Sequence, residues 1–157
     1  RFVLISEEIE CVRQYIWLLK MRFGERYRFR IEVQDEVLGY ETPALILQPL
    51  VENAVVHGFE DYEEGGEIVV SARLEGDTIR LSVSDSGKGM KREEITVALA
   101  AADLEDDTPQ HGIGLHNVVR RVALATTEQG KVEIQSEPGH GTRVTITLPI
   151  GIKGLSQ

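Results

Sequence analysis

Residues 45–58 read Leu-Ile-Leu-Gln-Pro-Leu-Val-Glu-Asn-Ala-Val-Val-His-Gly. Thr42 and Pro43 suit the N-cap and first turn of a helix here, and Gly58 suits its C-terminal cap. Apolar side chains recur at the three- and four-residue steps of a helix, at Leu47, Leu50, Val51, Ala54 and Val55. The stretch therefore predicts a mostly buried helix over 45–58.

Three polar residues, Glu52, Asn53 and His57, interrupt the apolar pattern of this helix. Asn53 and His57 are four residues apart, so they share one face. Burying a polar side chain is costly unless a partner satisfies it. Asn53 therefore either bonds a neighbouring backbone group or serves a ligand, and the motifs downstream favour the ligand.

The flanking segments alternate between helical and strand patterns. Ser6, followed by Glu7 and Glu8, begins a predicted helix that ends at Gly24. This helix packs on its own domain or on another chain through a seam of Ile9, Val12, Ile16, Leu19 and Phe23. Apolar–polar alternation predicts strands over 27–33, 67–74, 78–84, 131–136 and 143–148, and Glu75-Gly76-Asp77 predicts a hairpin between 67–74 and 78–84. Helical spacing predicts helices over 91–101 and 114–125. This order predicts an α/β (α+β) fold in which a mixed sheet is covered on one face by helices.

Composition limits the classes of protein to consider. The 157 residues are enough for one domain with a proper core. The net charge of −9 argues against a nucleic-acid partner, because such binding depends on Lys and Arg neutralising phosphates. No apolar run approaches the roughly 18 residues of a membrane span, so we expect no membrane contact by this domain. The single cysteine, Cys11, excludes a disulfide framework and fits a reducing compartment.

Two glycine-containing motifs lie downstream of the central helix. Asp85-Ser86-Gly87-Lys88-Gly89-Met90 directly follows strand 78–84. A carboxylate at a strand end can accept a hydrogen bond from an exocyclic amine, and the glycines let the backbone approach a flat ring. His111-Gly112-Ile113-Gly114-Leu115 leads into helix 114–125, where free N–H groups and the helix dipole make a phosphate site. With Asn53, these motifs predict a nucleotide site.

Other nucleotide and hydrolase motifs are absent from the sequence. Lys88 lacks the upstream glycine and the following Ser or Thr of a P-loop. Asn117 stands where a dinucleotide fingerprint starting at Gly112 needs a glycine. The histidines do not form a zinc-protease pair, and no G-x-S-x-G nucleophile elbow is present.

Taken together, the three motifs resemble those of the Bergerat-fold ATPase superfamily, which includes sensor histidine kinases and DNA gyrase B. Residues 47–54 and 22–26 resemble the LytS/YesM-type sensor histidine kinases, and the resemblance covers nearly everything from about Glu7 to Pro149. It implies the Bergerat ATP-binding fold, a two-layer sandwich with a mainly antiparallel sheet. It also implies ATP and Mg²⁺ as cofactors, and transfer of the ATP γ-phosphoryl group to a protein histidine.

The resemblance implies a role for each matching residue. Asn53 would ligate Mg²⁺, and Glu52 would orient a metal-bound water. Asp85 would accept a hydrogen bond from the adenine amino group, while His57, Lys88 or Arg120 would meet phosphate charge. The other positions implied to bind nucleotide are Gly87, Gly89, Met90, Gly112, Gly114, Leu115 and Thr142, with residues 91–111 as the ATP lid.

The resemblance also implies a domain organisation and partners. Residues 1–24 would be the C-terminal end of a dimerisation helix, 25–150 the catalytic domain and 151–157 a tail. The phosphoacceptor histidine would lie in an upstream segment of a longer, homodimeric parent kinase that signals to a response regulator. The domain would be cytoplasmic, and the parent would be anchored in the cell membrane.

Three positions depart from the family pattern. Val56 replaces a usual lysine, and His116 replaces a common arginine. Pro49 stands where gyrase-like members carry a water-activating glutamate, which favours transfer to a histidine over efficient hydrolysis. Two alternatives stay open: a stand-alone ATPase or protein-serine kinase of the anti-sigma type, and a non-catalytic nucleotide-sensing scaffold.

Overall fold

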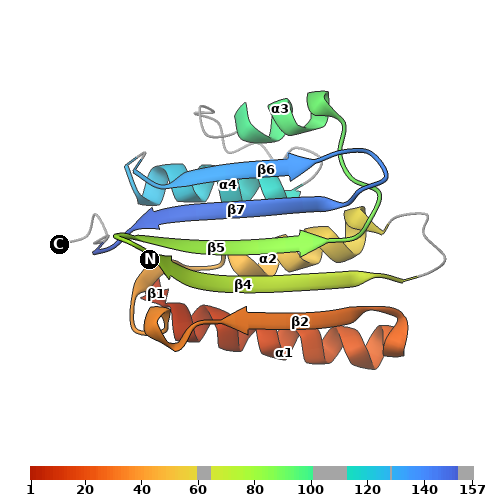
Figure 1. Cartoon of the computed structure of the whole chain (residues 1–157), viewed down its shortest axis with the longest axis horizontal. Coiled ribbons are helices and arrows are strands. Elements are labelled where there is room, and N and C mark those ends of the chain that lie inside the picture. Colours follow the sequence, from red (N-terminus) through yellow and green to blue (C-terminus); the bar gives the residue numbers. More distant parts are fainter. Residues whose placement is uncertain (60–64, 101–112, 128, 152–157) are drawn as a thin grey trace.

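The computed structural model describes residues 1–59, 65–100, 113–127 and 129–151 (Figure 1). The helices are α1 (Ile5–Phe23), α2 (Leu47–Asn53), α3 (Arg92–Ala100) and α4 (Ile113–Ala125), with single 3₁₀ turns at Gly24–Arg26 and Asp35–Val37 and a π turn at Ala54–Gly58. The strands are β1 (Phe2–Leu4), β2 (Arg28–Val33), β3 (Glu41–Pro43), β4 (Glu67–Glu75), β5 (Thr78–Asp85), β6 (Lys131–Ser136) and β7 (Thr142–Pro149). All five predicted strands and four predicted helices are therefore present.

The main sheet has the strand order β2-β4-β5-β7-β6. Strand β2 runs parallel to β4, and the other three pairings are antiparallel, which confirms the mixed, mainly antiparallel sheet. The predicted hairpin joins β4 to β5 through Gly76 and Asp77, where Gly76 has a φ of 59° that favours glycine. The sheet order brings the end of β5 beside the start of β7.

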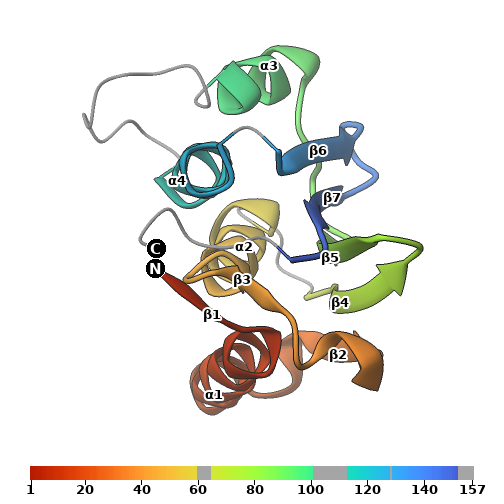
Figure 2. The same cartoon turned by 90° about the vertical axis from the view of Figure 1, so that its left-hand side faces the viewer.

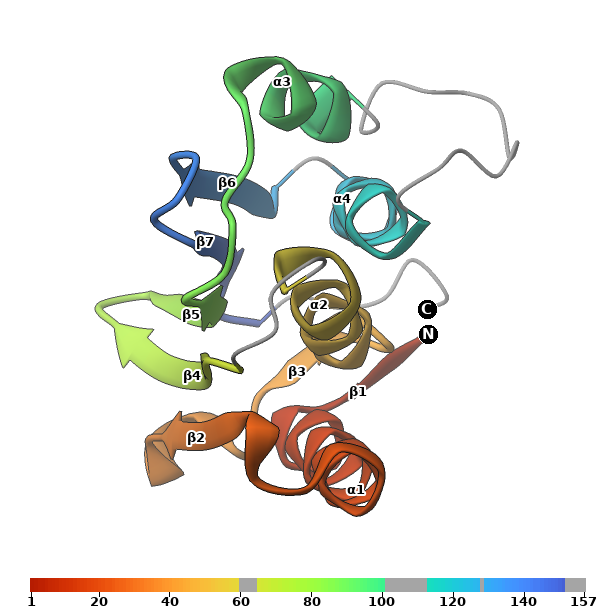
Figure 3. The same ribbon diagram turned by 90° about the vertical axis from the view of Figure 1, so that its right-hand side faces the viewer.

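Helices α1, α2 and α4 cover one face of the sheet, and α3 lies beyond its β6 edge (Figures 2 and 3). Along β5, Ile79, Leu81 and Val83 point into the core between the two layers and are buried. The opposite face is polar, as the ion pair between Arg30 and Glu32 illustrates. The two-layer sandwich is confirmed. None of the helices in the described ranges is long and apolar enough to cross a bilayer.

Helix α1 packs on its own domain, which answers the question that the sequence left open. Its inward face is buried at Ile5, Ile9, Val12, Ile16 and Leu19. These side chains belong to the same core as the sheet and the other helices. The first 24 residues and the catalytic domain therefore share one core, so Gly24 ends a helix without dividing the structure.

The start of α2 differs from the prediction. Thr42 and Pro43 lie in β3, which pairs with β1 in a two-stranded sheet that the sequence did not reveal. The helix begins only at Leu47. Its first N–H groups are capped from α1: Glu8, which is 4% exposed, accepts hydrogen bonds from the N–H groups of Leu45, Ile46 and Leu47 at 2.6, 3.2 and 3.2 Å.

Helix α1 also begins earlier than predicted, at Ile5 rather than after Ser6. The Glu7 carboxylate accepts a hydrogen bond from the Leu4 N–H at 2.8 Å, so the acidic side chain three residues on takes the capping role predicted for the serine.

The end of α2 also differs from the prediction. The α-helix ends at Asn53 and continues as a π turn over Ala54–Gly58, where an uninterrupted helix was predicted. Such turns are rare and often lie at functional sites. Gly58 ends the segment as predicted, but the reason is space: a Cβ there would lie 3.0 Å from Asp85 Oδ1.

Candidate functional site

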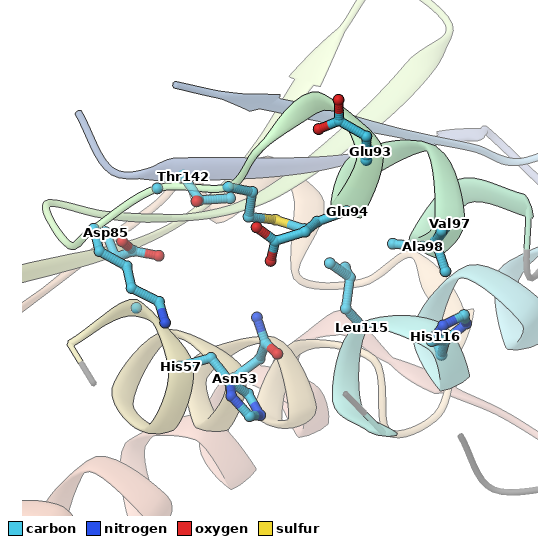
Figure 4. Close-up of a pocket in the computed structure, with 14 residues that line it drawn as sticks. Asn53, His57, Asp85, Glu93, Glu94, Val97, Ala98, Leu115, His116 and Thr142 are labelled. Carbon is cyan, nitrogen blue, oxygen red and sulfur yellow. The ribbon is translucent and has the colours of Figure 1, made fainter. Parts of the chain in front are cut away.

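A cavity of about 440 Å³ opens between the end of α2, the loop after β5, α3 and the start of α4 (Figure 4). This volume suits a small organic ligand. Its lining residues are Asn53, His57, Gly58, Asp85, Lys88, Gly89, Met90, Glu93, Glu94, Val97, Ala98, Leu115, His116 and Thr142. Positions from all the predicted motifs therefore meet around one space.

Asp85 ends β5 at the wall of this cavity. Its Oδ1 accepts a hydrogen bond from the Gly87 N–H at 2.8 Å, and the backbone N–H of Thr142 donates to the same carboxyl group. Burial raises the pKa of Asp85, and these two hydrogen bonds lower it in part. A half-buried, backbone-held carboxylate of this kind can accept a further hydrogen bond from a ligand amine.

The glycines after Asp85 are needed for contacts inside the protein. A Cβ on Gly87 would lie 1.9 Å from the Gly58 carbonyl oxygen, to which the Lys88 N–H donates a hydrogen bond of 2.7 Å. Gly89 has a φ of 76°, and a Cβ there would lie 2.0 Å from the Glu137 carbonyl oxygen. Packing within the protein therefore requires glycine at both positions, and the expected approach of the backbone to a flat ring stays a prediction. Gly89 lines the cavity, and Gly87 does not.

Thr142 enters the cavity wall from the start of β7 and is tied to Ser136, a residue that the sequence analysis missed. Thr142 Oγ1 lies 2.8 Å from Ser136 Oγ, and the Met90 N–H donates to Ser136 Oγ at 2.7 Å. Ser136 Oγ in turn donates to the Gly141 carbonyl oxygen at 2.7 Å. Contacts that join residues 46 positions apart leave no signal in a sequence pattern.

The helix side of the cavity carries Asn53, His57, Leu115 and His116. Figure 4 shows the Asn53 side chain directed into the space above α2. Gly114 itself does not line the cavity. Because Gly114 has no Cβ, α4 can approach α2 closely: a Cβ there would lie 3.0 Å from the Pro49 carbonyl oxygen.

Some predicted site residues fall elsewhere. Glu52 is exposed and does not line the cavity. Burial raises the pKa of the Tyr15 hydroxyl on α1, and the Glu52 carboxylate raises it further, which places Glu52 on the α1 side of α2. Val56 is 54% exposed and also lies outside the cavity. Gly112, like lid residues 101–111, lies outside the described residues.

Two carboxylates from α3 lie within the predicted lid but were not singled out as site residues. Glu93 and Glu94 line the cavity (Figure 4), and the Lys91 N–H donates to Glu94 Oε1 at 3.2 Å, as at the N-terminus of a helix. In the described part of the chain, no group of three or more His, Cys, Asp or Glu residues could hold a metal ion. A cation here would therefore need ligands from water or a bound molecule besides a side chain such as Asn53.

Comparison with known proteins agrees with this geometry. Residues 40–152 match the family of histidine kinase-, DNA gyrase B- and HSP90-like ATPases. Sensor histidine kinase YesM of Bacillus subtilis is 34% identical over 147 residues, which cover 94% of this chain and 24% of that protein. Sensor histidine kinase BtsS of Escherichia coli K12 is 30% identical over 148 residues, with coverages of 94% and 24%. The chain thus spans about a quarter of the length of these relatives.

The fold is shared with solved kinase domains. The catalytic domain of histidine kinase ThkA superposes with a TM-score of 0.67 at 19% identity, covering 95% of this chain and 94% of that one. The family match includes Asn53, Asp85 and Thr142, which meet at the cavity. On this evidence, the chain belongs to the histidine kinase-, DNA gyrase B- and HSP90-like ATPase family.

Proposed function

We propose that this chain is the ATP-binding catalytic domain of a sensor histidine kinase, and that it donates the γ-phosphoryl group of ATP to a histidine elsewhere in its parent. The observation that carries the proposal is the single cavity at which Asn53, Asp85, Leu115 and Thr142 meet from four separate elements. Membership of an ATPase family identifies ATP as the nucleotide.

The base of the nucleotide belongs at the sheet side of the cavity. Asp85 accepts a hydrogen bond from the adenine amino group, which guanine lacks at that position. Thr142 lies beside this carboxylate, and Met90 and Leu115 supply apolar wall for the ring. A carboxylate with a raised pKa is desolvated, so the hydrogen bond that it accepts is worth more than one made in water.

The phosphates belong at the helix side. Bound Mg²⁺ would neutralise phosphate charge, and the Asn53 amide oxygen would be the ligand that this chain offers to such a hard cation. The N–H groups in the first turn of α4, where Leu115 and His116 line the cavity, suit phosphate oxygens. Of the side chains predicted to meet phosphate charge, His57 and Lys88 line the cavity.

The chain favours transfer over hydrolysis. Position 49, four residues before Asn53, holds a proline that has no proton-accepting side chain. Glu52, the residue expected to orient a metal-bound water, does not line the cavity. Phosphoryl transfer instead depends on holding the acceptor in line with the γ-phosphate, and such positioning can supply roughly 7–11 kcal/mol of a barrier.

The acceptor and the other partners belong to the parent protein. We propose that a histidine-containing dimerisation segment docks beside α1, whose outer face carries Trp17, Leu18 and Met21 at 62, 58 and 68% exposure. The parent would be a homodimer that passes the phosphoryl group to a response regulator. A cytoplasmic position, in a parent anchored in the membrane, agrees with the need for ATP and with the free thiol of Cys11.

The proposal is tested by incubating the chain with γ-labelled ATP, first alone and then with the histidine-containing segment of its parent. Alone, the chain should hydrolyse ATP slowly and retain no label, because position 49 holds proline and the acceptor histidine is proposed to lie elsewhere in the parent. With the segment, a label should appear that is labile to acid and stable to base, as a phosphoramidate is.

Each other outcome favours one of the alternatives. Rapid hydrolysis by the chain alone would favour a stand-alone ATPase, and base-labile labelling of a serine would favour a protein-serine kinase. ATP binding without any labelling of the added segment would favour a nucleotide-sensing scaffold. An absence of ATP binding would overturn all of these functions together.

A further inference from the structure

Ser136 lies beside Thr142 on the sheet side of the cavity, although it does not line the cavity itself. It ends β6, where it pairs with Thr142 of β7, and Thr142 pairs in turn with Asp85 of β5. The three residues form one row across three neighbouring strands. Ser136 is therefore two strands away from the Asp85 carboxylate, the proposed acceptor for the adenine amino group.

The Ser136 hydroxyl uses its whole hydrogen-bonding capacity. It has one proton to donate and two lone pairs to accept with. The proton goes to the Gly141 carbonyl oxygen at 2.7 Å, and the lone pairs receive the Met90 N–H at 2.7 Å and the Thr142 hydroxyl at 2.8 Å. One small side chain thus joins the loop after β5, the turn before β7 and the first residue of β7.

These three partners belong to segments that adjoin Asp85. Met90 lies at the end of the motif that Asp85 begins, and Thr142 donates its N–H to the Asp85 carboxyl group. Gly141 packs against Asp85 so closely that a Cβ on Gly141 would lie 2.0 Å from the Asp85 carbonyl oxygen. A shift of either segment would therefore move the donors that hold the carboxylate.

We propose that Ser136 is a positioning residue for base recognition, which fixes Thr142 and Met90 so that Asp85 presents its carboxylate to the adenine amino group. The inference rests on the proposed nucleotide site. It assigns to Ser136 an effect on the choice between adenine and guanine, because that choice depends on where the carboxylate points. Phosphate binding at the helix side should be affected less.

The test compares ATP and GTP affinities by calorimetry for the unmutated chain and for Ser136→Ala, Ser136→Thr and Ser82→Ala. Ser82 is the matched control: it is a strand serine on β5 whose hydroxyl bonds that of Ser71 on the outer face of the sheet, away from the cavity. Thermal unfolding of each variant establishes that the measured chain is folded.

We expect Ser136→Ala to weaken ATP binding about tenfold, because it removes hydrogen bonds that are individually worth about 2- to 13-fold in affinity. GTP binding should weaken by less than about threefold, so that discrimination between the two bases falls. Ser136→Thr, which keeps the hydroxyl, should recover most of the ATP affinity, and Ser82→Ala should behave as the unmutated chain.

Equal losses of ATP and GTP affinity in Ser136→Ala would overturn the proposal, because a purely structural role of Ser136 would lower both affinities by the same factor. So would unchanged ATP affinity in Ser136→Ala, or a Ser136→Thr variant as impaired as Ser136→Ala. An unmutated chain that binds ATP and GTP equally would instead defeat the assignment of Asp85 itself, on which the inference rests.

Discussion

The two sides of the cavity are built differently. On the sheet side, hydrogen bonds between strands and loops fix Asp85 and Thr142 before any ligand arrives. On the helix side, Asn53, Glu93 and His116 line the cavity, and no hydrogen bond within the described residues ties these side chains to another element. A preorganised side suits selection of a base, and a side with unpaired polar groups suits a metal ion and phosphates that bring their own charge.

The largest loss of ATP affinity should come from a substitution on the helix side of the cavity. Asn53→Ala should remove Mg²⁺-dependent ATP binding while leaving the fold intact, because alanine is the best helix former. Calorimetry with and without Mg²⁺ checks this, with Gln48→Ala on the same helix as control, since Gln48 does not line the cavity. Unchanged Mg·ATP affinity in a folded Asn53→Ala chain would mean that the helix side does not hold the metal.

A smaller loss should follow from a change on the sheet side. Asp85→Asn keeps the size of the side chain but loses the charged acceptor, and a hydrogen bond to a charged group contributes about 1.5–3 kcal/mol. ATP affinity should therefore fall about 10- to 150-fold, with less discrimination against GTP. If titrations of the variant with ATP and GTP match those of the unmutated chain, the sheet side does not select the base.

The same substitution should change stability in the opposite direction. Burial raises the pKa of Asp85 in the folded chain, so its ionised form costs stability at neutral pH. The free energy of unfolding is therefore highest, as far as Asp85 contributes, below the ordinary pKa of an aspartate. This contribution is lost as the pH rises through the raised pKa of the folded chain. Asp85→Asn should therefore melt at a higher temperature than the unmutated chain at neutral pH.

The gain should disappear as the pH falls below the ordinary range of an aspartate, where the carboxyl group is protonated in both folded and unfolded chains. Melting curves across this pH range check the sign. A variant that is less stable at neutral pH would indicate that the hydrogen bonds from Gly87 and Thr142 outweigh the cost of burial.

The smallest effect on nucleotide affinity is expected at the start of α2. Glu8→Ala leaves three N–H groups without their acceptor, and leaving a buried donor unsatisfied costs about 1–3 kcal/mol. Chemical denaturation should show this loss, while ATP affinity measured well below the melting temperature stays the same. A loss of affinity as large as that of Asp85→Asn would show that the start of α2 is coupled to the cavity.

Much of the fold could be predicted because its signals are local. Alternation of apolar and polar residues marked every strand of the main sheet, and Gly76 with Asp77 marked the hairpin. The start and end of α2 could not be found in this way. Glu8 caps the helix from 37 residues upstream, and β1 and β3 are three residues each, too short for a periodic pattern.

The site was predicted in part for the same reason. Asn53, Asp85 and Thr142 belong to short motifs, and the structure brings them to one cavity. Glu52 belongs to the same motif as Asn53 but does not line the cavity, and its carboxylate instead acts on Tyr15 of α1, a contact between helices that a local pattern does not reveal. Ser136 was missed because its importance lies in contacts across the sheet, which depend on strand order.

If this cavity is the nucleotide site, it holds the base on its sheet side and the metal on its helix side. A crystal structure of the chain with Mg²⁺ and a non-hydrolysable ATP analogue would locate both. We expect the adenine amino group within hydrogen-bond distance of the Asp85 carboxylate, and Mg²⁺ on the Asn53 amide oxygen. Nucleotide bound outside the cavity, or with its phosphates toward Asp85 and its base toward Asn53, would show that the assignment of the two sides is wrong.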